Sequence, residues 1–473
     1  MPLPPGPQTP AILQVFQWII DPFSFMQNCY QAYGDCFTVR LGEKFSPIVF
    51  ISQPQALQTI LTNDESGLFD APGDLNGVFE PFLGTQSVIG LSGDRHRRMR
   101  KLMMPPFHGE RMRSYGQLIS DITESVIRDW QVGEPFSVRE PMQTITFRVI
   151  LGAVFGLTDG PRYREVEALL KGMLEEMSNP LAVSLLYVPV LQRDFGSWSP
   201  WGKFLRKRQQ LDRLIYDEIA ERRAHPDPTR NDILTLLMSA RDEAGEPMTD
   251  VELRDELMTL LVAGHDTTAT ALSWALYWIH KFPEVRERLL QEFQGLPVPT
   301  DPSALLNLPY LNAVCSETLR IYPVGMLTFP RVVRSPIELA GHRFEPGAIL
   351  NGVIYLTHRR EETYPEPEQF KPERFLERQF SPFEFLPFGA GSRRCIGMAF
   401  AQFEMKVVLS KILSELELSL ASDRPVKPVR RGLTSAPSSV DLVVKRRHSL
   451  DSIAQKNLEQ SSEFAASNMS DRQ

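Results

Sequence analysis

Cys395 stands alone in a loop rich in glycine and arginine, where its thiol could be a structural group, a nucleophile or the only protein ligand of a cofactor metal. The loop reads FGAGSRRCIG from Phe388 to Gly397. Structural zinc needs four ligands, and no second cysteine is close enough in sequence to supply one. A nucleophile needs a positioned base, and no nearby histidine suggests itself. Haem iron fits better, because the porphyrin supplies four nitrogens and the protein adds one axial ligand.

The residues around the cysteine suit that role. Gly389, Gly391 and Gly397 lack a Cβ atom, so they allow turns with positive φ and let the backbone approach a flat macrocycle. After Gly397, MAFAQFEMKVVLSKILSEL has helical periodicity, which places the sulfur near a helix N-terminus whose dipole favours the thiolate. Arg393 can reach a carboxylate at the porphyrin edge. Phe388 would pack beside the loop as an apolar shield.

The loop resembles the haem-ligand signature F-x-x-G-x-R-x-C-x-G of the cytochromes P-450. Its fixed positions are Phe388, Gly391, Arg393, Cys395 and Gly397. The resemblance covers roughly residues 5 to 445. It implies a haem-thiolate monooxygenase that uses O2 and heme b (iron protoporphyrin IX), with Cys395 on the iron. It also implies a cytochrome P450 fold in which the haem is buried between a long central helix and the cysteine loop.

Polar residues interrupt an otherwise apolar helical stretch, LLVAGHDTTATALSW. Polar groups inside a helix must find partners, and here the segment resembles the family motif A-G-x-D-T-T. By that resemblance Ala263 and Gly264 leave room beside the porphyrin. Thr267 can bond back to a carbonyl and open the helix locally. Asp266 and Thr267 would then relay protons to iron-bound dioxygen, while the thiolate donates electron density from the other side.

A second family motif, E-x-x-R, is present in the segment ETLR. Glu317 and Arg320 stand three residues apart on one helical face, and KPERF downstream supplies Arg374. Taken alone the motif is weak. By resemblance these three residues form a buried charged triad that braces the haem loop.

Basic residues form a third group. In GDRHRRMRKL, His96 and Arg100 are i, i+4 neighbours and resemble the residues that hold the haem propionates, as does Arg331 in TFPRVV. Many family members have tryptophan where this chain has His96. The other basic residues of the segment make a local positive patch: Arg95, Arg97, Arg98 and Lys101. The resemblance implies that an acidic electron donor, ferredoxin or flavodoxin with its reductase, docks on this side.

Composition excludes several other classes. The chain has 473 residues and a net charge of -7, which disfavours wholesale nucleic-acid binding. Four cysteines without a secretory leader predict free thiols and a cytoplasmic protein. No apolar run reaches the roughly 18 to 20 residues that a transmembrane span needs. AILQVFQWII near the start could be an amphipathic surface helix, although an ordinary packed helix is favoured. We expect a monomer.

Hydrophobic periodicity predicts the elements that position these residues. Apolar residues at helical spacing occur in five segments: Met112 to Asp129, Gly160 to Met177, Trp201 to Ala224, Thr249 to Lys281 and Glu284 to Gln294. Strand-like alternation is confined to Phe37 to Ser52 and Arg331 to Leu350, the latter with turns at Gly341 and Gly347. The fold class is therefore mainly α with a small β portion. We expect one domain over residues 1–446 and a polar, disordered tail over residues 447–473.

The substrate is less constrained by the sequence. By position, the pocket would be lined by residues 68–84, 181–201, 260–271 and 324–329, which are mostly apolar and favour a lipophilic substrate. Core packing explains the same residues nearly as well. The chain is similar to cyanobacterial family members that act on fatty acids and terpenoids, so a long-chain fatty acid is favoured, with a terpenoid or alkane next. Lys44 could bind a carboxylate at the channel mouth. A haem-binding sensor or carrier without turnover is the alternative function.

Overall fold

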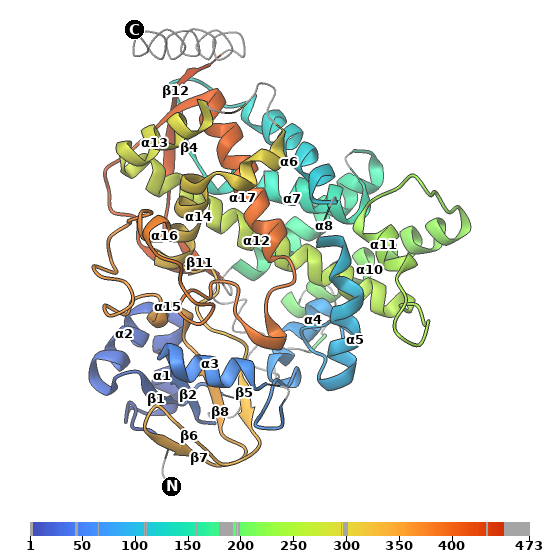
Figure 1. Ribbon diagram of the computed structural model, residues 1–473. Coiled ribbons are helices and arrows are strands. Elements are labelled where there is room, and N and C mark those ends of the chain that lie inside the picture. The colour runs from blue at the N-terminus through green and yellow to red at the C-terminus, as the bar shows by residue number, and fades with distance from the viewer. Residues whose placement is uncertain are drawn as a thin grey trace, which may run out of the picture.

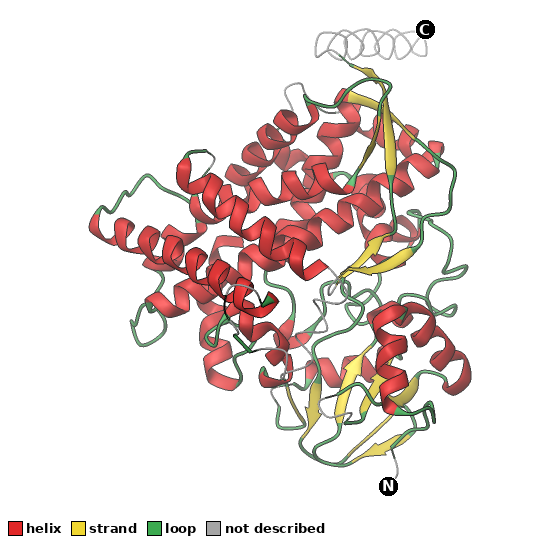
Figure 2. Cartoon of the chain, turned by 180° about the vertical axis from the view of Figure 1, so that it is seen from behind, coloured by secondary structure: helices red, strands yellow, loops and turns green. Residues whose placement is uncertain are grey.

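Helices fill most of the molecule, and the larger share of the strands lies at the end that holds the N-terminus (Figures 1 and 2). The computed structural model describes residues 3–42, 46–64, 66–107, 109, 111–157, 159–178, 193–194, 196, 199–294, 296, 301–431 and 434–448. The predicted class, mainly α with a small β portion, is confirmed.

The central element is α12, which spans Asp250–Lys281, has 32 residues and runs through the middle of the molecule (Figure 1). It starts with a capping box, in which the Thr249 side chain accepts from the Glu252 amide and the Glu252 carboxylate accepts from the Thr249 amide. Nearly all of its side chains from Leu253 to Ile279 are buried. A helix buried over most of its surface must be enclosed by other elements of the fold.

Helices α7 (Arg139–Phe155) and α17 (Met398–Glu415) pack against α12, as does α14 (Pro309–Ile321). The other α-helices are α1 (Ala11–Ile20), α2 (Pro22–Tyr33), α3 (Pro54–Thr62), α4 (Glu80–Leu83), α5 (Gly93–Met103), α6 (Arg111–Ile127), α8 (Pro161–Ser178), α10 (Pro200–Ala224), α11 (Ile233–Ser239), α13 (Pro283–Gln294), α15 (Ile354–Thr357) and α16 (Arg374–Glu377). Short 3₁₀ turns are η2 (Asp74–Phe79), η3 (Pro105–Phe107), η5 (Pro302–Asn307) and η6 (Gly391–Arg393).

The largest sheet has the strand order β1-β2-β8-β5-β3. Its members are β1 (Cys36–Val39), β2 (Ile48–Ile51), β8 (Ile349–Gly352), β5 (Arg331–Val333) and β3 (Phe69–Asp70). Strands β2 and β8 are parallel, and the other neighbours are antiparallel. A separate hairpin joins β6 (Ile337–Leu339) to β7 (His342–Phe344), with its turn at Gly341 in the positive-φ region. Both segments expected to hold strands therefore do so.

The expectation that strands are confined to these two segments is wrong. Strands β4 (Pro135–Ser137), β12 (Asp441–Arg447) and β9 (Leu416–Leu420) form a three-stranded sheet, and β10 (Pro428–Arg431) pairs with β11 (Thr434–Pro437). These strands are short, and their partners are far apart in sequence. Periodicity within one segment cannot reveal pairing of that kind.

All five predicted helices are present within two residues of their expected ends. The prediction omitted α7, which is buried on most of its surface and so lacks the one-sided apolar stripe of an amphipathic helix. Strand β12 ends at Arg447, and the His448 amide donates to the Glu415 carbonyl at 2.8 Å. Arg447 and His448, which the expectation assigned to the tail, therefore belong to the described fold. The rest of the expected tail falls outside the described residues, as does Lys44.

Within the described residues, no helix is long and apolar enough to cross a membrane. The N-terminal segment AILQVFQWII forms α1, as one of the two interpretations expects, but it does not pack like an ordinary core helix. Its apolar side chains Ile12, Phe16 and Ile20 are exposed, and the polar Gln14 is buried.

Candidate active site

The cysteine loop is built from two tight turns followed by a helix. Gly389 and Gly391 have φ values of 65° and 71°, the left-handed region that glycine adopts without strain. The Cys395 amide donates to the Phe388 carbonyl at 3.0 Å, which closes the loop. Gly397 differs from the expectation of a positive φ, because its φ is -81° and it is the N-cap of α17. The sulfur therefore lies two residues before a helix N-cap, as the sequence predicts.

The Cys395 side chain is accessible although the residue lies deep among protein atoms. This combination means that the thiol faces an interior space. Burial raises the pKa of Cys395, while the Gly397 amide and the charges of Arg100 and Arg394 act in the opposite direction. A bound metal cation removes the proton from a coordinating thiol outright, so the site suits a metal-bound thiolate.

The middle of α12 also faces accessible space. Ala263 is exposed in a helix whose flanking residues are buried, and its neighbours Val262 and Gly264 are partly exposed. A Cβ atom on Gly264 would come within 2.9 Å of Ile150 on α7, so this glycine permits close helix packing. The accessible stretch of α12 and the accessible sulfur fit a flat group held between the central helix and the cysteine loop.

Thr267 bonds back along α12, as its motif predicts. Its Oγ1 donates to the Ala263 carbonyl at 2.5 Å. The expected local opening of the helix is not present, because α12 is assigned as helix throughout Asp250–Lys281. A hydroxyl that shares the carbonyl of the residue four positions earlier is compatible with an intact helix.

Asp266 is held by partners that the sequence did not predict. Its Oδ1 accepts hydrogen bonds from Arg139 Nη2 at 2.6 Å and from Gln143 Nε2 at 2.9 Å, both on α7. Its Oδ2 accepts a weaker bond from Thr434 Oγ1 at 3.3 Å, on β11. About a quarter of the Asp266 side chain is exposed, at 24%. The carboxylate therefore lies between the interior of the helix bundle and the solvent.

The expected propionate contacts lie close enough to influence one another. His96 is buried, and its pKa is lowered to about 3, first by burial and then by the charges of Arg393, Arg100 and Arg331. The charge of Asp64 acts in the opposite direction. A guanidinium group can donate two hydrogen bonds to one carboxylate, so three such groups close to His96 suit the two acidic groups on the edge of haem b.

Arg393 makes only carbonyl contacts among the described residues. Its Nη1 donates to Val88 O at 2.9 Å, and its Nη2 donates to Ala71 O and Leu91 O, both at 2.5 Å. Burial and the charge of Arg331 lower the Arg393 pKa to about 10. Arg393 thus ties the loop of residues 71–91 to the cysteine loop.

Asp64, which the sequence analysis missed, joins two parts of the site. Its Oδ2 accepts from Arg331 Nη2 at 2.7 Å and from Ser392 in the cysteine loop, through the amide and the hydroxyl, both at 2.9 Å. Asp64 lies in a turn after α3 and belongs to no motif. Only the folded structure reveals its role.

The charged triad expected beneath the cysteine loop is confirmed. Glu317 and Arg320 are fully buried and joined by two bonds, Nε to Oε2 at 2.6 Å and Nη2 to Oε1 at 2.8 Å. Arg374 Nε donates to the same Glu317 carboxylate at 3.3 Å. The bonds satisfy charges that would otherwise be costly to bury.

His358 extends this triad to the cysteine loop. Arg320 Nη1 donates to the His358 carbonyl at 2.8 Å, and the Leu386 amide donates to His358 Nε2 at 3.0 Å. Its Nδ1 lies 3.2 Å from the Arg320 carbonyl and must therefore carry the proton. Leu386 accepts the turn bond from Gly389, at the start of the loop.

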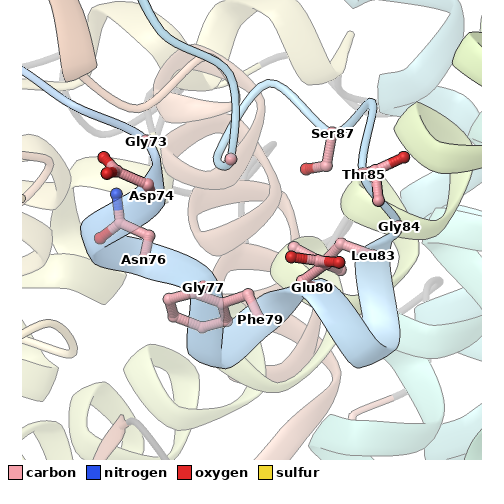
Figure 3. A pocket seen from close by; sticks show the side chains of 11 residues that line it. Gly73, Asp74, Asn76, Gly77, Phe79, Glu80, Leu83, Gly84, Thr85 and Ser87 are labelled. Carbon is pink, nitrogen blue, oxygen red and sulfur yellow. The ribbon is translucent and has the colours of Figure 1, made fainter. Parts of the chain in front are cut away.

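The loop of residues 71–91 is fastened to α12 from the other side. The Gln86 amide donates to Asp255 Oδ2 at 2.8 Å, the Val88 amide donates to Glu256 Oε1 at 2.6 Å, and the Ser87 and Thr259 hydroxyls are 2.8 Å apart. A shallow pocket among residues 73–90 lies on the η2 and α4 part of this loop (Figure 3). Figure 3 shows the polar side chains of Asp74, Asn76 and Glu80 together with the apolar Phe79 and Leu83 around it, and Cys395 does not line this pocket.

The positive patch expected on α5 is largely neutralised. Arg98 is bonded to Asp242 at 2.5 Å and to Glu252 at 2.8 Å. Lys101 pairs with Glu243, Arg97 pairs with Asp94, and Arg95 donates to Gln86. The acidic partners of Arg98 and Lys101 are more than 140 residues away in sequence, so the charge run alone could not reveal them.

Comparison with known proteins agrees with this architecture. The sequence matches the cytochrome P450 family model over residues 3–444. Cytochrome P450 135B1 of Mycobacterium tuberculosis is 37% identical over 438 residues, which are 92% of this chain and 90% of that protein. Cytochrome P450 135A1 of the same organism is 33% identical over 452 residues, 94% of this chain and 96% of that protein. The chain belongs to the cytochrome P450 family.

A solved structure extends the match to the fold. The retinoic acid-bound cyanobacterial CYP120A1 has a TM-score of 0.79 and 25% identity, and the match covers 95% of this chain and 100% of that one. This chain is accordingly a haem-thiolate monooxygenase with heme b as its cofactor. No three His, Cys, Asp or Glu side chains within the described ranges gather to hold a metal ion.

Proposed function

We propose that this enzyme inserts one oxygen atom from O2 into a lipophilic substrate, with a long-chain fatty acid favoured and a terpenoid or alkane next. The observation that carries the proposal is a set of partly exposed apolar side chains. Three come from segments expected around the pocket, namely Phe79, Val262 and Val324, and three come from neighbouring loops, namely Ile89, Phe388 and Ile396; all six pack on one core cluster. Apolar surface of this kind favours a ligand that is itself apolar.

The structural relative supports a lipid that ends in a carboxylate. Its title names retinoic acid as the bound molecule. That compound joins an isoprenoid chain to a carboxylic acid, so it shares features with both favoured substrate classes. At 25% identity the likeness supports the class of ligand for this chain, and the choice within the class rests on the experiment below.

We assign the haem contacts as follows. Cys395 would supply the thiolate that binds the iron, Ala263 and Gly264 would border the haem from α12, and Phe388 and Gly397 would flank the sulfur. His96, Arg100, Arg331 and Arg393 would meet the propionates. The charges of Arg393, Arg100 and Arg331, all of which act on His96, support this last assignment.

Bound haem supplies the activation of dioxygen, and the chain supplies protons. Thr267 is proposed to hold a proton at Oγ1 on the accessible side of α12, where it now donates to Ala263. Asp266 is proposed to resupply that proton. Because its carboxylate is bonded to Arg139, it must exchange that contact to reach Thr267 or a water beside it. Its partial exposure gives it a source of protons in solvent.

Electrons are proposed to come from a ferredoxin or flavodoxin and its reductase. The neutralised cations of α5 are poor candidates for the docking surface. Arg394 is better placed, because it is exposed, adjoins Cys395 and is bonded to Met398 Sδ at 3.0 Å. Among the described residues it has no ion-pair partner.

A ligand screen tests the substrate class. Purified enzyme is titrated with long-chain fatty acids, terpenoids and alkanes while the haem absorption is followed. Ligands that shift the spectrum are then incubated with ferredoxin, reductase and NADPH, and products are identified by mass spectrometry. We expect a hydroxylated fatty acid. A spectral shift and product with terpenoids or alkanes but not with fatty acids would reverse the order, and polar ligands alone would contradict the lipophilic class.

A further inference from the structure

Four oxidisable side chains contact one another between α12 and the end of α14, and they form what we call the aromatic cluster: Trp274, Tyr277, Trp278 and Tyr322. The Trp274 and Tyr322 rings are stacked, with their centroids 4.1 Å apart. Trp278 lies 6.0 Å from Tyr322, while Tyr277 lies 6.0 Å from Trp274 and 4.9 Å from Trp278. Indole and phenol rings lose an electron more easily than a benzene ring, and electrons pass readily between rings in contact. The cluster can therefore conduct electrons.

Trp274 is the inner end of the aromatic cluster. It follows Thr267 on α12 by seven residues, which is nearly two full turns, so both side chains lie on one face of the helix, about 10 Å apart along its axis. Trp274 is fully buried, and its Nε1 donates to the Ser435 carbonyl at 3.1 Å. The Ser435 amide donates in turn to the carbonyl of Val324, in a segment expected at the substrate pocket. On α12, Trp274 is thus the member of the cluster closest to the proposed haem site.

Tyr322 is the outer end of the aromatic cluster. It caps the C-terminus of α14 and, unlike Trp274, is partly exposed. Burial raises the pKa of Tyr322, with the charge of Arg359 acting in the opposite direction, so the phenol keeps its proton at neutral pH. Removal of an electron makes a phenol strongly acidic, and the exposure of Tyr322 lets solvent take the proton. Tyr322 can therefore be oxidised to a neutral radical and be reduced again from the surface.

Packing alone does not account for the indole of Trp278. Its Nε1 is buried and has no hydrogen-bond partner among the described residues. Phe370 stacks on Trp278 with the centroids 5.0 Å apart and the planes 7° apart. A phenylalanine in place of Trp278 could stack in the same way without a buried, unsatisfied donor. An electron-rich ring at this position favours a redox role.

We propose that the aromatic cluster carries electrons from reductants in solution to the haem site, where they reduce hydrogen peroxide when no substrate is bound. Reduction of one peroxide to two water molecules takes two electrons and two protons. Each electron would enter through Tyr322, which releases one proton to solvent as it is oxidised, and would pass inward through Trp274. A small thiol would restore Tyr322 by giving one electron and one proton, so two thiols become one disulfide for each peroxide removed.

This activity would protect the cysteine loop. Peroxide oxidises a cysteine thiolate to sulfenic and higher acids, and Cys395 is accessible from the interior space. The proposal rests on the position proposed above for the haem, beside Ala263 and Thr267, and it adds an activity to the oxygen insertion proposed there.

A peroxide challenge of the substrate-free holoenzyme tests the proposal. Hydrogen peroxide is added with or without glutathione, and the loss of haem absorption is followed. We expect glutathione to slow this loss about threefold in the parent and hardly at all in Tyr322→Phe, which keeps a stacked ring that is hard to oxidise. Tyr163→Phe, at a buried position on α8 outside the cluster, is the matched control and should be protected like the parent.

Mass spectrometry gives a second readout that does not depend on turnover. A nitroso spin trap, added together with the peroxide, labels side chains that become radicals. We expect the label on Tyr322 in the parent and the loss of most of it in Trp274→Phe, because the electron path to Tyr322 then lacks its inner ring. Tyr163→Phe should leave the label on Tyr322 unchanged.

The outcomes separate the possibilities. The proposal fails if glutathione protects Tyr322→Phe as well as the parent, if Tyr322 carries no label, or if folded Trp274→Phe keeps the full label. Trp274→Phe gives up the bond to Ser435, so thermal unfolding is measured as well, and Tyr322→Phe alone decides the proposal if that variant does not fold. A parent without a thiolate-type haem spectrum would overturn the proposed haem site. A normal parent spectrum with failure of the Tyr322→Phe test would overturn only the role of the cluster.

Discussion

Arg139 Nη2 donates to Asp266 Oδ1 across 2.6 Å and so joins α7 to the central helix α12, next to Thr267. Gln143 and Thr434 complete the shell of the carboxylate. The candidate proton donor of the enzyme is therefore held by an ion pair on the side of the helix that faces α7 and β11.

Arg139→Gln should destabilise the fold. The Arg139 and Asp266 side chains are 16% and 24% exposed, so the substitution leaves a partly buried carboxylate without its charged partner. We expect the free energy of unfolding to fall by about 1–3 kcal/mol in urea titrations. Arg128→Gln is the control, because it breaks an ion pair with Glu124 in which the two side chains are 71% and 41% exposed. This variant should change the free energy of unfolding by less than about 0.5 kcal/mol. Equal effects would contradict a special role for the buried pair.

Asp266→Asn should separate electron use from product formation. The amide keeps the shape of the side chain and can still accept from Arg139, but it cannot give up a proton at neutral pH. We expect the rate of product formation to fall on the order of 100-fold. NADPH oxidation should fall less, with the excess electrons recovered as peroxide. A variant with parental yield of product per NADPH would exclude Asp266 from the relay.

Glu317→Gln should be among the most damaging single changes in the protein. It leaves the fully buried Arg320 guanidinium without a counter-charge, for which we expect a cost of about 3–5 kcal/mol. Arg374→Gln should cost less, because its bond to Glu317 is longer, at 3.3 Å, and it also contacts carbonyls near the surface. Chemical denaturation of the two variants, with haem content as a second readout, checks the ranking. A larger effect for Arg374→Gln would contradict it.

The stability of the enzyme should fall in mild acid, in part because of His358. Burial, with the charge of Arg320, lowers the pKa of this histidine from 6.5 to about 3. Between these values the unfolded chain binds a proton that the folded chain does not. The stability that the protein gains from keeping His358 neutral is therefore fully present above about pH 6.5. It decreases as the pH falls toward 3, with a slope of roughly 1.4 kcal/mol per pH unit.

Urea titrations at pH 7 and pH 5 measure this slope. His358→Gln should be less stable at pH 7, because the Leu386 amide loses its acceptor, and should lose less stability on acidification than the parent. His225→Gln, at an exposed position, is the control and should keep the parental slope. An unchanged slope in His358→Gln would show that the other buried histidines account for the acid sensitivity.

Cys395→Ser should fold but lose the thiolate-type absorption spectrum. The backbone of the loop is closed by the bond from the residue 395 amide to Phe388 O, which serine keeps. A hydroxyl is a weak iron ligand at neutral pH, so we expect little or no monooxygenase activity. Circular dichroism and haem absorption check both parts. Parental spectrum and turnover in the variant would refute the assignment of the axial ligand.

The sequence predicted the parts of the site that are contiguous in the chain. The cysteine loop, the back-bonded Thr267 and the Glu317–Arg320 pair each use residues a few positions apart, so their geometry follows from local turns and helices. Arg374, the distant partner of Glu317, was predicted by resemblance, but the partners of Asp266 and of Ser392 were not. Arg139 lies 127 residues from Asp266, and Asp64 lies 328 residues from Ser392.

The omission of α7 has the same origin as the missing partners of Asp266. A helix buried on nearly all sides shows no alternation of apolar and polar faces, so periodicity does not mark it. Without that helix, Arg139 and Gln143 had no place in the predicted site. The pairing of the basic residues on α5 was missed for a related reason. The counter-charges of Arg98 come from a distant loop and from the start of α12.

The contacts of Asp64 limit which segments can be exchanged between this enzyme and its relatives. A single carboxylate holds both Arg331 in the N-terminal sheet and Ser392 in the cysteine loop. A chimera whose crossover points separate these three positions would combine halves that each evolved with another partner. Recombination libraries should therefore inherit residues 64, 331 and 392 from one parent, however distant the breakpoints are in the gene.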